Sequence, residues 1–291
     1  MHIVAVIALL ILILIIAPYI PHTARMLLYI SIAIYFTSIR PLYGVLAVVS
    51  IFLFDRWKVR EEIPRDIYQT WSTKDLPPKM KACVEKLQRD NPEFEYHLYD
   101  DADCRAFIAD EFDPKVVKAY DALIPGAFKA DLWRYCILYK RGGVYVDIKF
   151  QCEPGFSFKD ISSDFIVREY NDKGTGLYED IVYTGCIASK PLNPIFLTAI
   201  DRICENVTKK YYGRGHTDVT GPQMFGACFS KGELSGMTHA YYEENGVGFI
   251  RDISSTKVIM SHYPEYRDEQ KTAADKPYWK TAWMNRAIYR D

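Results

Sequence analysis

The N-terminal part of the chain is almost continuously apolar. Residues 3–17 carry no polar side chain, and apolar character resumes over residues 26–54, interrupted by one arginine-proline pair and a few small polar residues. A helix needs about 20 apolar residues to span a bilayer, so residues 2–20 qualify and a second segment follows. No basic stretch precedes the apolar run and no small-residue cleavage site follows it, which disfavours a cleaved signal peptide. The pattern predicts a membrane anchor over residues 1–56, with one or two transmembrane helices.

From Trp57 onward, charged and apolar residues are mixed, which indicates a soluble domain over residues 57–291. Short runs of period two alternate there with longer runs whose apolar residues recur every three or four positions. Such alternation of strands and helices is typical of an α/β fold. Strands are expected at 63–71, 94–99, 164–168, 181–188 and 258–260, and helices at 76–89, 102–110, 114–123, 192–207 and 220–229.

The most informative stretch is 128–150, which predicts a helix, a sharp turn and one strand. Four side chains at helical spacing form an expected buried stripe: Leu132, Tyr135, Cys136 and Tyr139. Asp131 and Arg134 lie one turn apart beside this stripe, so both could meet one ligand. The alternative is an ordinary ion pair on the helix surface.

Gly142-Gly143 is expected to end this helix, because glycine tolerates the left-handed conformation common at a helix C-terminus. The period then changes to two, and three apolar residues are expected to face the core: Val144, Val146 and Ile148. The opposite face takes three polar or amphipathic residues: Tyr145, Asp147 and Lys149. In an open α/β sheet, ligands bind at the end of the strand where these residues lie. In the alternative interpretation, Asp147 only terminates a strand.

Charge and cysteine content narrow the classes of function. The formal net charge is −1, so no bulk positive field draws the protein to nucleic acid. The 7 cysteines are scattered without C-x-x-C spacing, which argues against a zinc site and against a full disulfide framework. They are expected to be reduced and buried, with a bridge or two still open as an alternative in a secretory lumen.

Residues 130–147 carry the spacing A-D-x-x-R-x(3)-L-x(3)-G-G-V-Y-x-D. This motif resembles the signature of glycosyltransferase family 32, which has a DXD sugar-nucleotide motif. The family includes fungal α-mannosyltransferases and inositol-phosphorylceramide mannosyltransferases, and bacterial glucosylating toxins are more distantly similar. The resemblance implies a GT-A fold, with a Rossmann-like mixed sheet flanked by helices. It also implies transfer of a hexose from a nucleotide sugar with retention of configuration, with Asp131, Arg134 and Asp147 as the catalytic residues.

One position departs from the family pattern. Asp147 corresponds to the first Asp of DXD, whereas Lys149 replaces the second, which would bind the metal directly. An ammonium group has no lone pair to offer an ion. Either Asp147, His262 and the diphosphate still hold Mn²⁺ or Mg²⁺, or Lys149 supplies the positive charge itself. The first account is favoured, because GT-A enzymes often supply a metal ligand from a C-terminal histidine, although a structural role is the alternative for His262.

Other segments resemble donor-binding parts of the family. The segment IPRDIYQTW at 63–71 matches the pattern that opens the nucleotide-binding half, although core packing is the alternative for its tryptophan. The Thr-Gly-Pro segment at 220–222 resembles a family loop, and free N–H groups at a helix start can hold an anion. The donor-binding candidates are Gln69, Trp71, Tyr145, Lys149, Thr220 and Gly221. Asp101 is expected to cap the helix at 102–110 rather than to contact a ligand.

Together these features predict a membrane-anchored retaining hexosyltransferase. Its partners would be GDP-mannose or a UDP-hexose as donor, a lipid or glycan acceptor, and the membrane, with mannose favoured on family breadth. An endomembrane of the Golgi or ER type is expected if the source is eukaryotic or viral. The alternative is a catalytically silent, membrane-tethered nucleotide-sugar-binding protein that lost its metal site with the second Asp. Front-face attack and double displacement through an enzyme carboxylate both stay open as routes to retention.

Overall fold

The computed structural model describes residues 62–170, 176–273 and 277–290. The predicted membrane anchor over 1–56 and the predicted boundary at Trp57 lie outside these residues. Within the described ranges, no helix combines the length and the apolar character that crossing a bilayer requires.

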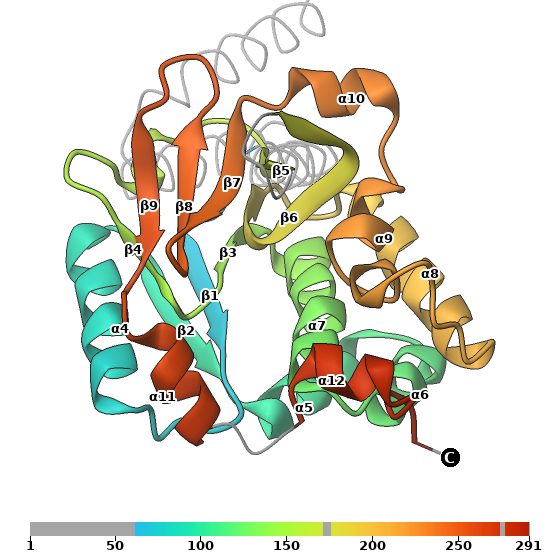
Figure 1. Cartoon of the computed structure of the whole chain (residues 1–291). Coiled ribbons are helices and arrows are strands. Elements are labelled where there is room, and N and C mark those ends of the chain that lie inside the picture. The colour runs from blue at the N-terminus through green and yellow to red at the C-terminus, as the bar shows by residue number, and fades with distance from the viewer. Residues whose placement is uncertain (1–61, 171–175, 274–276, 291) are drawn as a thin grey trace, which may run out of the picture. The chain divides into compact units, whose positions relative to one another are not determined.

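The described chain contains both strands and helices, as its two periodicities predict (Figure 1). The strands are β1 Asp66–Thr70, β2 Glu95–Tyr99, β3 Gly143–Val146, β4 Phe150–Cys152, β5 Phe165–Tyr170, β6 Leu177–Ser189, β7 His239–Glu244, β8 Val247–Asp252 and β9 Val258–His262. The helices are α4 Pro78–Asp90, α5 Asp101–Glu111, α6 Pro114–Ala122, α7 Gly126–Arg141, α8 Pro194–Thr208, α9 Pro222–Gly226, α10 Lys231–Gly236, α11 Tyr266–Ala273 and α12 Trp279–Met284. Every element predicted between residues 63 and 260 overlaps one of these.

The described strands form one mixed sheet in the order β2-β1-β3-β6-β5-β7-β8-β9-β4. β1 pairs in parallel with β2 and β3, and β5 pairs in parallel with β7. The other neighbouring strands are antiparallel. A mixed α/β sheet is therefore confirmed.

β3 lies near one edge of the sheet, whereas the next strand along the chain, β4, lies at the opposite edge. Three residues separate these strands, so their facing ends lie within about 14 Å of each other. β3 and β4 are also six positions apart in the strand order. In a flat sheet, spacings of about 4.8 Å would then place them roughly 29 Å apart. The part of the sheet between β3 and β4, which consists of β6, β5, β7, β8 and β9, must therefore curl around the turn at 147–149. This curl brings strands that are distant in sequence close to that turn.

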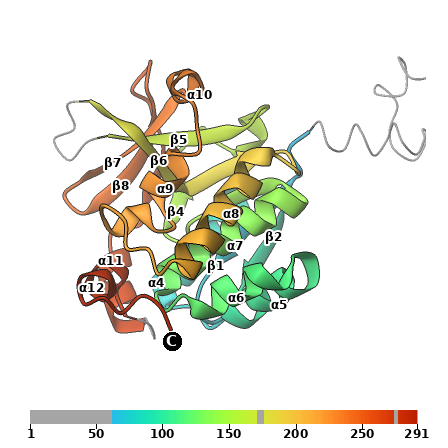
Figure 2. The ribbon, with the colours of Figure 1, turned by 90° about the vertical axis from the view of Figure 1, so that its right-hand side faces the viewer.

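Helices flank the sheet on both sides (Figures 1 and 2). On one side α6, α7 and α8 pack together, and their core includes Tyr145 and Ile187 of the strands. α4 lies on the other side, where Leu87 joins a separate core with Val144 and Val146. Tyr145 enters one core, and its neighbours Val144 and Val146 enter the other. The predicted period-two alternation of this strand is therefore confirmed.

The helix α7 is buried on nearly every side rather than along one stripe. Every residue from Asp131 to Leu138 is buried, because the helix lies between the sheet and α5, α6, α8 and α12. The helix ends as predicted at Gly142 and Gly143, with φ of 70° and 88°. A Cβ at Gly142 would lie 2.6 Å from the backbone nitrogen of Pro191, so a glycine is also needed for the close approach of that segment.

Several local predictions are wrong in detail. β3 ends at Val146, so Asp147 and Lys149 lie in a turn between two strands and not on the face of a single strand. The N-cap of α5 is Asp100 instead of Asp101, since its side chain accepts a hydrogen bond from the N–H of residue 103. Leu192 is 40% exposed and precedes α8, so it does not join the buried face of that helix.

Candidate active site

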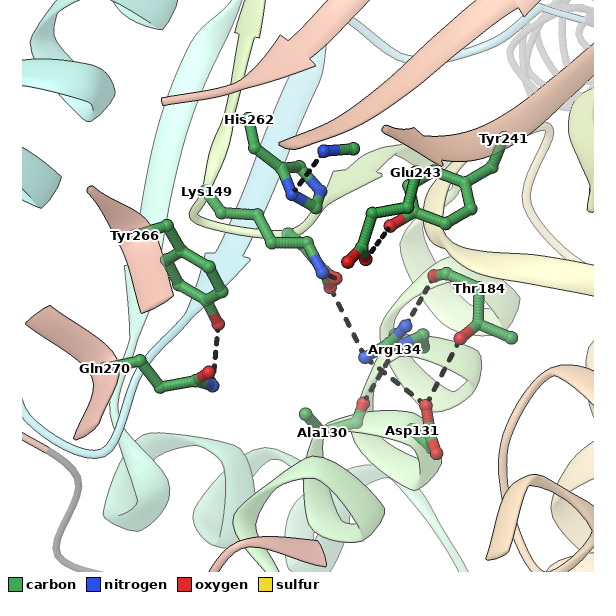
Figure 3. A network of polar contacts seen from close by, with 12 residues as sticks. Ala130, Asp131, Arg134, Lys149, Thr184, Tyr241, Glu243, His262, Tyr266 and Gln270 are labelled. Atoms are coloured by element: carbon green, nitrogen blue, oxygen red, sulfur yellow. Dashed lines mark hydrogen bonds and ion pairs between the residues drawn. The ribbon is translucent and has the colours of Figure 1, made fainter. Parts of the chain in front are cut away.

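The turn at 147–149 faces the middle of α7 at the carboxyl end of β3 (Figure 3). α7 supplies Asp131 and Arg134, and the turn supplies Asp147 and Lys149. Arg134 lies within ion-pair distance of both Asp131 and Asp147, so the three side chains predicted as catalytic lie close together. The structure therefore brings these three side chains together.

The guanidinium group of Arg134 bridges two carboxylates. Its Nη2 lies 3.3 Å from Oδ1 of Asp131 and 3.5 Å from Oδ1 of Asp147. Nη1 donates a hydrogen bond to the carbonyl of Thr184 in β6, and the group lies 4.4 Å from the ring centroid of Tyr145. A planar guanidinium presents several donors in fixed directions, so one residue can orient both carboxylates. Only 6% of this side chain is exposed, which favours a positioning role.

Asp131 is held by side chains from distant parts of the chain. Thr220 donates a hydrogen bond to Oδ2 at 2.7 Å, and Thr184 donates one to Oδ1 at 3.5 Å. Burial raises the pKa of Asp131 above its ordinary value, while Arg134 and the two hydroxyls oppose that shift. A Cβ at Gly221 would lie 3.2 Å from Oδ2, so Gly221 allows its loop to approach closely. The predicted donor-binding residues Thr220 and Gly221 thus lie against Asp131.

Asp147 is the more exposed of the two carboxylates, with 22% of its side chain accessible. Its Oδ2 lies 3.0 Å from Nζ of Lys149, and its Oδ1 accepts a 2.9 Å hydrogen bond from the hydroxyl of Tyr145. Burial by itself would raise the pKa of Asp147. The charges of Lys149 and Arg134, together with these hydrogen bonds, hold that pKa below its ordinary value. Asp147 is therefore ionised at neutral pH.

Two predicted donor-binding residues lie in or next to β1. Gln69 is fully buried, donates a hydrogen bond to the carbonyl of Asp147 at 3.3 Å, and accepts one from the hydroxyl of Tyr96 at 3.0 Å. It thereby fixes the backbone that carries the Asp147 carboxylate. Trp71 is half-buried and packs with the cluster that α4 forms with Tyr263 and α11. Trp71 is therefore partly exposed, whereas Gln69 has no exposed surface.

His262, the predicted metal ligand, ends β9 and is 2% exposed. Its Nδ1 accepts a hydrogen bond from the N–H of Gly248 at 3.2 Å, so the neutral ring carries its proton on Nε2. Burial keeps the pKa of His262 far below its ordinary value, and the charges of Lys149 and Arg267 add to this shift. A protonated ring nitrogen has no lone pair for a metal, so this histidine does not fit the predicted role.

The acidic groups near the turn also offer no free ligand set for a divalent cation. Both oxygens of Asp147 already face donors or cations. In the part of the chain that the structure describes, one group of three potential ligands lies close enough to hold an ion: Asp66, Glu95 and His97, on β1 and β2. Neither Asp147 nor His262 belongs to it. The residues present therefore do not fit the Mn²⁺ or Mg²⁺ site predicted from the sequence.

Three residues near the turn were not singled out by the sequence. Thr184 and Gly185 lie in β6, where the carbonyl of Gly185 accepts the N–H of Asp147 at 2.8 Å. The pair Thr184-Gly185 places two small residues inside a largely apolar stretch, which is a sequence signal for this position. Arg267 lies in α11, where its Nη2 is 3.6 Å from Glu243 of β7. Nothing in the sequence around Arg267 distinguishes it from an ordinary surface arginine.

A separate open hollow of about 620 Å³ lies between α6 and α8. Its walls include Lys115, Asp201 and Lys209. Two of these residues already form an ion pair, Lys115 with Asp201 at 2.8 Å. The hollow shares no residue with the network at the turn, so it is not part of the candidate active site.

Comparison with known proteins identifies the segment that carries the network. Residues 77–163 match the family described as a glycosyltransferase sugar-binding region containing a DXD motif. Inositol phosphoceramide mannosyltransferase 3 of Schizosaccharomyces pombe is 38% identical over 94 residues, which are 31% of this chain and 25% of that protein. Initiation-specific alpha-1,6-mannosyltransferase of Candida albicans is 34% identical over 91 residues, which are 29% of this chain and 24% of that protein. Residues 77–163 of this chain are therefore similar to the sugar-binding region of DXD-containing glycosyltransferases.

These relatives are matched over only part of their length. The chain spans about a quarter of these two curated proteins, at 25% and 24%. Among solved structures, the PaToxG glycosyltransferase is similar with 16% identity and a TM-score of 0.44, covering 65% of this chain and 78% of that chain. DXD glycosyltransferases typically use a divalent metal, whereas the matching segment of this chain carries Lys149 in place of one expected carboxylate.

Proposed function

We propose that this chain is a membrane-anchored retaining hexosyltransferase with a GT-A fold, which takes its sugar, preferably mannose, from a nucleotide donor. The observation that carries the proposal is the bridge that Arg134 forms between Asp131 and Asp147 at the carboxyl end of β3. Ligands bind at that end of the strands in open α/β sheets. The two fungal relatives named as mannosyltransferases support mannose as the sugar.

The exposure of each side chain suggests its role. Asp147 and Lys149 are partly exposed, at 22% and 12%, and would contact the donor. The carboxylate accepts hydrogen bonds from sugar or ribose hydroxyls, and the ammonium group faces the diphosphate. Asp131 and Arg134 are buried and act through Asp147, which they hold in position. Small displacements of a positioned group cost an enzyme much of its rate, so this support matters for catalysis.

The proposed reaction breaks the bond between the anomeric carbon and the phosphate oxygen, and the electron pair stays on the nucleoside diphosphate. The acceptor hydroxyl forms the new bond with retention, and its proton passes to the departing phosphate oxygen. Positive charge near the departing phosphate lowers the barrier, because negative charge develops there in the transition state. Front-face attack needs no enzyme nucleophile. A double displacement would need a carboxylate within reach of the anomeric carbon. Asp147 is the candidate for this role, because its side chain is more exposed than that of Asp131.

The proposed acceptor is a lipid or a glycan displayed at a membrane. The apolar segments within residues 1–56 support anchoring in a bilayer, of the ER or Golgi type in a eukaryotic or viral setting. An anchored domain works next to the bilayer surface, where such acceptors are concentrated. Partition of the labelled product between organic solvent and water distinguishes the two kinds of acceptor.

The activity is tested with the full-length chain in detergent micelles. Labelled GDP-mannose, UDP-glucose and UDP-galactose are supplied separately, and release of the nucleoside diphosphate is measured. We expect turnover of one donor class and a loss of at least about a hundredfold in Asp147→Asn, because that change removes the charge that orients Lys149 and the donor. Asp268→Asn is the matched control, since the Asp268 side chain is 85% exposed. The control variant should keep the wild-type rate.

The alternative function is a catalytically silent nucleotide-sugar binder, which the lysine at the second position of DXD supports. The same samples separate the two functions. Absence of turnover with every donor, combined with calorimetric binding of GDP or UDP, would reject the transferase and favour the binder.

A further inference from the structure

The polar groups around the turn at 147–149 are arranged as ion pairs. Among the described residues of this site, Asp131 pairs with Arg134 at 3.3 Å, Asp147 pairs with Lys149 at 3.0 Å and with Arg134 at 3.5 Å, and Glu243 pairs with Arg267 at 3.6 Å. Each carboxylate therefore has a cation of its own. The formal charges of this cluster cancel before any ligand binds.

Lys149 is fixed in its position from several sides. Its carbonyl accepts a hydrogen bond from the N–H of Tyr263 at 3.1 Å, which ties the turn to the end of β9. Its side chain extends toward Arg134 (Figure 3). Three aromatic ring centroids lie within 5.8 Å of its ammonium group: those of Phe150, Tyr183 and Tyr266. With 12% of the side chain exposed, the ammonium group is a preformed and partly desolvated positive charge.

This geometry leaves no coordination position on Asp147 for a divalent cation. An ion on Oδ2 would meet the ammonium group of Lys149, which lies 3.0 Å from that oxygen. Oδ1 accepts the hydroxyl of Tyr145 and lies 3.5 Å from Arg134. Like charges at such distances repel strongly in a partly buried site. A metal ion would therefore have to expel Lys149 before Asp147 could bind it.

Two buried donors beside Lys149 have no partner among the described residues, namely Nε2 of His262 and the hydroxyl of Tyr183. His262 lies next to Lys149 (Figure 3). A Cβ on Gly185 would lie 2.5 Å from the Tyr183 hydroxyl and 2.6 Å from Oδ2 of Asp147, so this hydroxyl ends near the carboxylate. Buried donors without an acceptor are costly, and oxygens of an anionic ligand would satisfy them.

A second cation, Arg267, reaches the same place from α11. Its guanidinium group is 3.6 Å from Glu243 and its side chain is 38% exposed, so it is both accessible and only loosely paired. Its partner Glu243 lies beside Lys149 (Figure 3), and the charge of Arg267 lowers the pKa of Lys149. Burial lowers the pKa of Lys149 further, and the charge of Asp147 opposes both effects. Two cations and two unpaired donors thus lie around the turn that carries Asp147.

We propose that Lys149, assisted by Arg267, takes the place of the divalent cation and binds the diphosphate of the nucleotide sugar directly. This inference rests on the proposed function and states which positive charges bind the diphosphate in its active site. When the bond to the sugar breaks, the electron pair settles on the phosphate oxygen that faces Lys149. Both cations stay protonated throughout, and no proton moves to or from them. Nucleoside diphosphates therefore bind without Mn²⁺ or Mg²⁺.

Calorimetric titration of the full-length chain in detergent with GDP and with UDP tests this inference. We expect the wild-type dissociation constant to agree within about twofold between EDTA and saturating Mn²⁺. Lys149→Ala should weaken binding about tenfold or more in EDTA, because it removes a charge that contacts the diphosphate. Lys149→Asp restores a DXD sequence and should bind only when Mn²⁺ is present. Lys149→Arg keeps the charge and should stay independent of metal.

The wild-type comparison alone can overturn the inference, so it does not depend on the folding of any variant. A wild-type affinity that falls about tenfold in EDTA rejects it, as does absence of GDP and UDP binding. Donor turnover by the same samples decides the proposed function separately. Turnover that requires Mn²⁺ leaves the transferase standing and removes the role of Lys149. Metal-independent binding without turnover keeps the diphosphate site and rejects the transferase.

Discussion

The hydroxyl of Thr220 donates a 2.7 Å hydrogen bond to Oδ2 of Asp131, although 89 positions separate the two residues in sequence. Thr220 is fully buried just before α9, and Asp131 lies in the buried middle of α7. One turn further along α7, Tyr135 donates a second hydrogen bond, to the carbonyl of Thr220 at 3.4 Å. These two hydrogen bonds therefore attach the loop before α9 to α7, the helix whose Arg134 contacts Asp147.

Thr220→Val removes the hydroxyl and keeps nearly the same side-chain volume. The buried carboxylate of Asp131 then loses a donor that lowers its pKa, so the pKa should rise further above its ordinary value. We expect the free energy of unfolding to fall by about 1 to 3 kcal/mol, measured by denaturant titration in detergent. Thr198→Val is the control, because Thr198 makes an exposed bond to the carbonyl of Pro194 within its own helix. Equal losses in both variants would contradict a special role for Thr220.

The helix, its glycine stop and the start of the next strand were predictable because their signals are local. Gly142 and Gly143 adopt the positive φ values that favour glycine. The spacing of Asp131 and Arg134 by one turn ensured that they would be neighbours on α7. The proximity of Asp147 followed from a more general rule, that polar residues at the carboxyl end of a strand in an α/β sheet gather at the ligand site.

Arg134→Lys tests whether the bridge between the carboxylates depends on the shape of the guanidinium group. Lysine keeps the charge but cannot contact Asp131, Asp147 and the carbonyl of Thr184 together. We expect a loss of at least about 2 kcal/mol in unfolding free energy. We also expect at least a fall of about tenfold in the rate of donor cleavage, because Asp147 loses its orientation.

The control for this variant is Arg141→Lys at the other end of the same helix. Arg141 is 55% exposed and pairs with Glu111 on the surface, so its replacement should change the unfolding free energy by less than about 1 kcal/mol. A wild-type rate in Arg134→Lys would show that charge alone is sufficient at this position.

The curl of the sheet could not be predicted, because it depends on pairing between strands that are far apart in the chain. Phe150 of β4 pairs with His262 of β9, and this register decides which side chains surround the turn. Period-two patterning placed Lys149 on the same face as Asp147 but could not say that its ammonium group would pair with that carboxylate. That contact depends on the turn at 147–149, where β3 has already ended. The sequence consequently left the metal question open.

The buried His262 predicts a fall in stability at mildly acidic pH. Burial keeps its pKa in the folded protein far below the value of about 6.5 expected after unfolding. Below pH ~6.5 the unfolded chain therefore binds a proton that the folded chain does not, so stability that is complete above this pH is lost as the pH falls. The contribution to the slope is up to about 1.4 kcal/mol per pH unit.

His262→Gln should flatten the pH profile of unfolding free energy between about pH 5 and pH 6.5. Burial also lowers the pKa of His216 and of His239. These two residues remain in the variant, so the slope should decrease without vanishing. The measurement is denaturant unfolding at a series of pH values. A slope equal to that of the wild type would mean that His262 is protonated in the folded protein, contrary to its packing.

Gly185→Ala probes the position of the Asp147 carboxylate without removing any charge. A Cβ at Gly185 would lie 2.6 Å from Oδ2 of Asp147 and 2.5 Å from the hydroxyl of Tyr183, so both groups must move. We expect the rate of donor cleavage to fall about a hundredfold, while overpacking costs about 1 to 3 kcal/mol of stability. Gly236→Ala is the matched control, since the space around Gly236 is open, and it should change neither quantity. An unchanged cleavage rate in Gly185→Ala, measured as release of the nucleoside diphosphate, would show that donor cleavage does not depend on the position of this carboxylate.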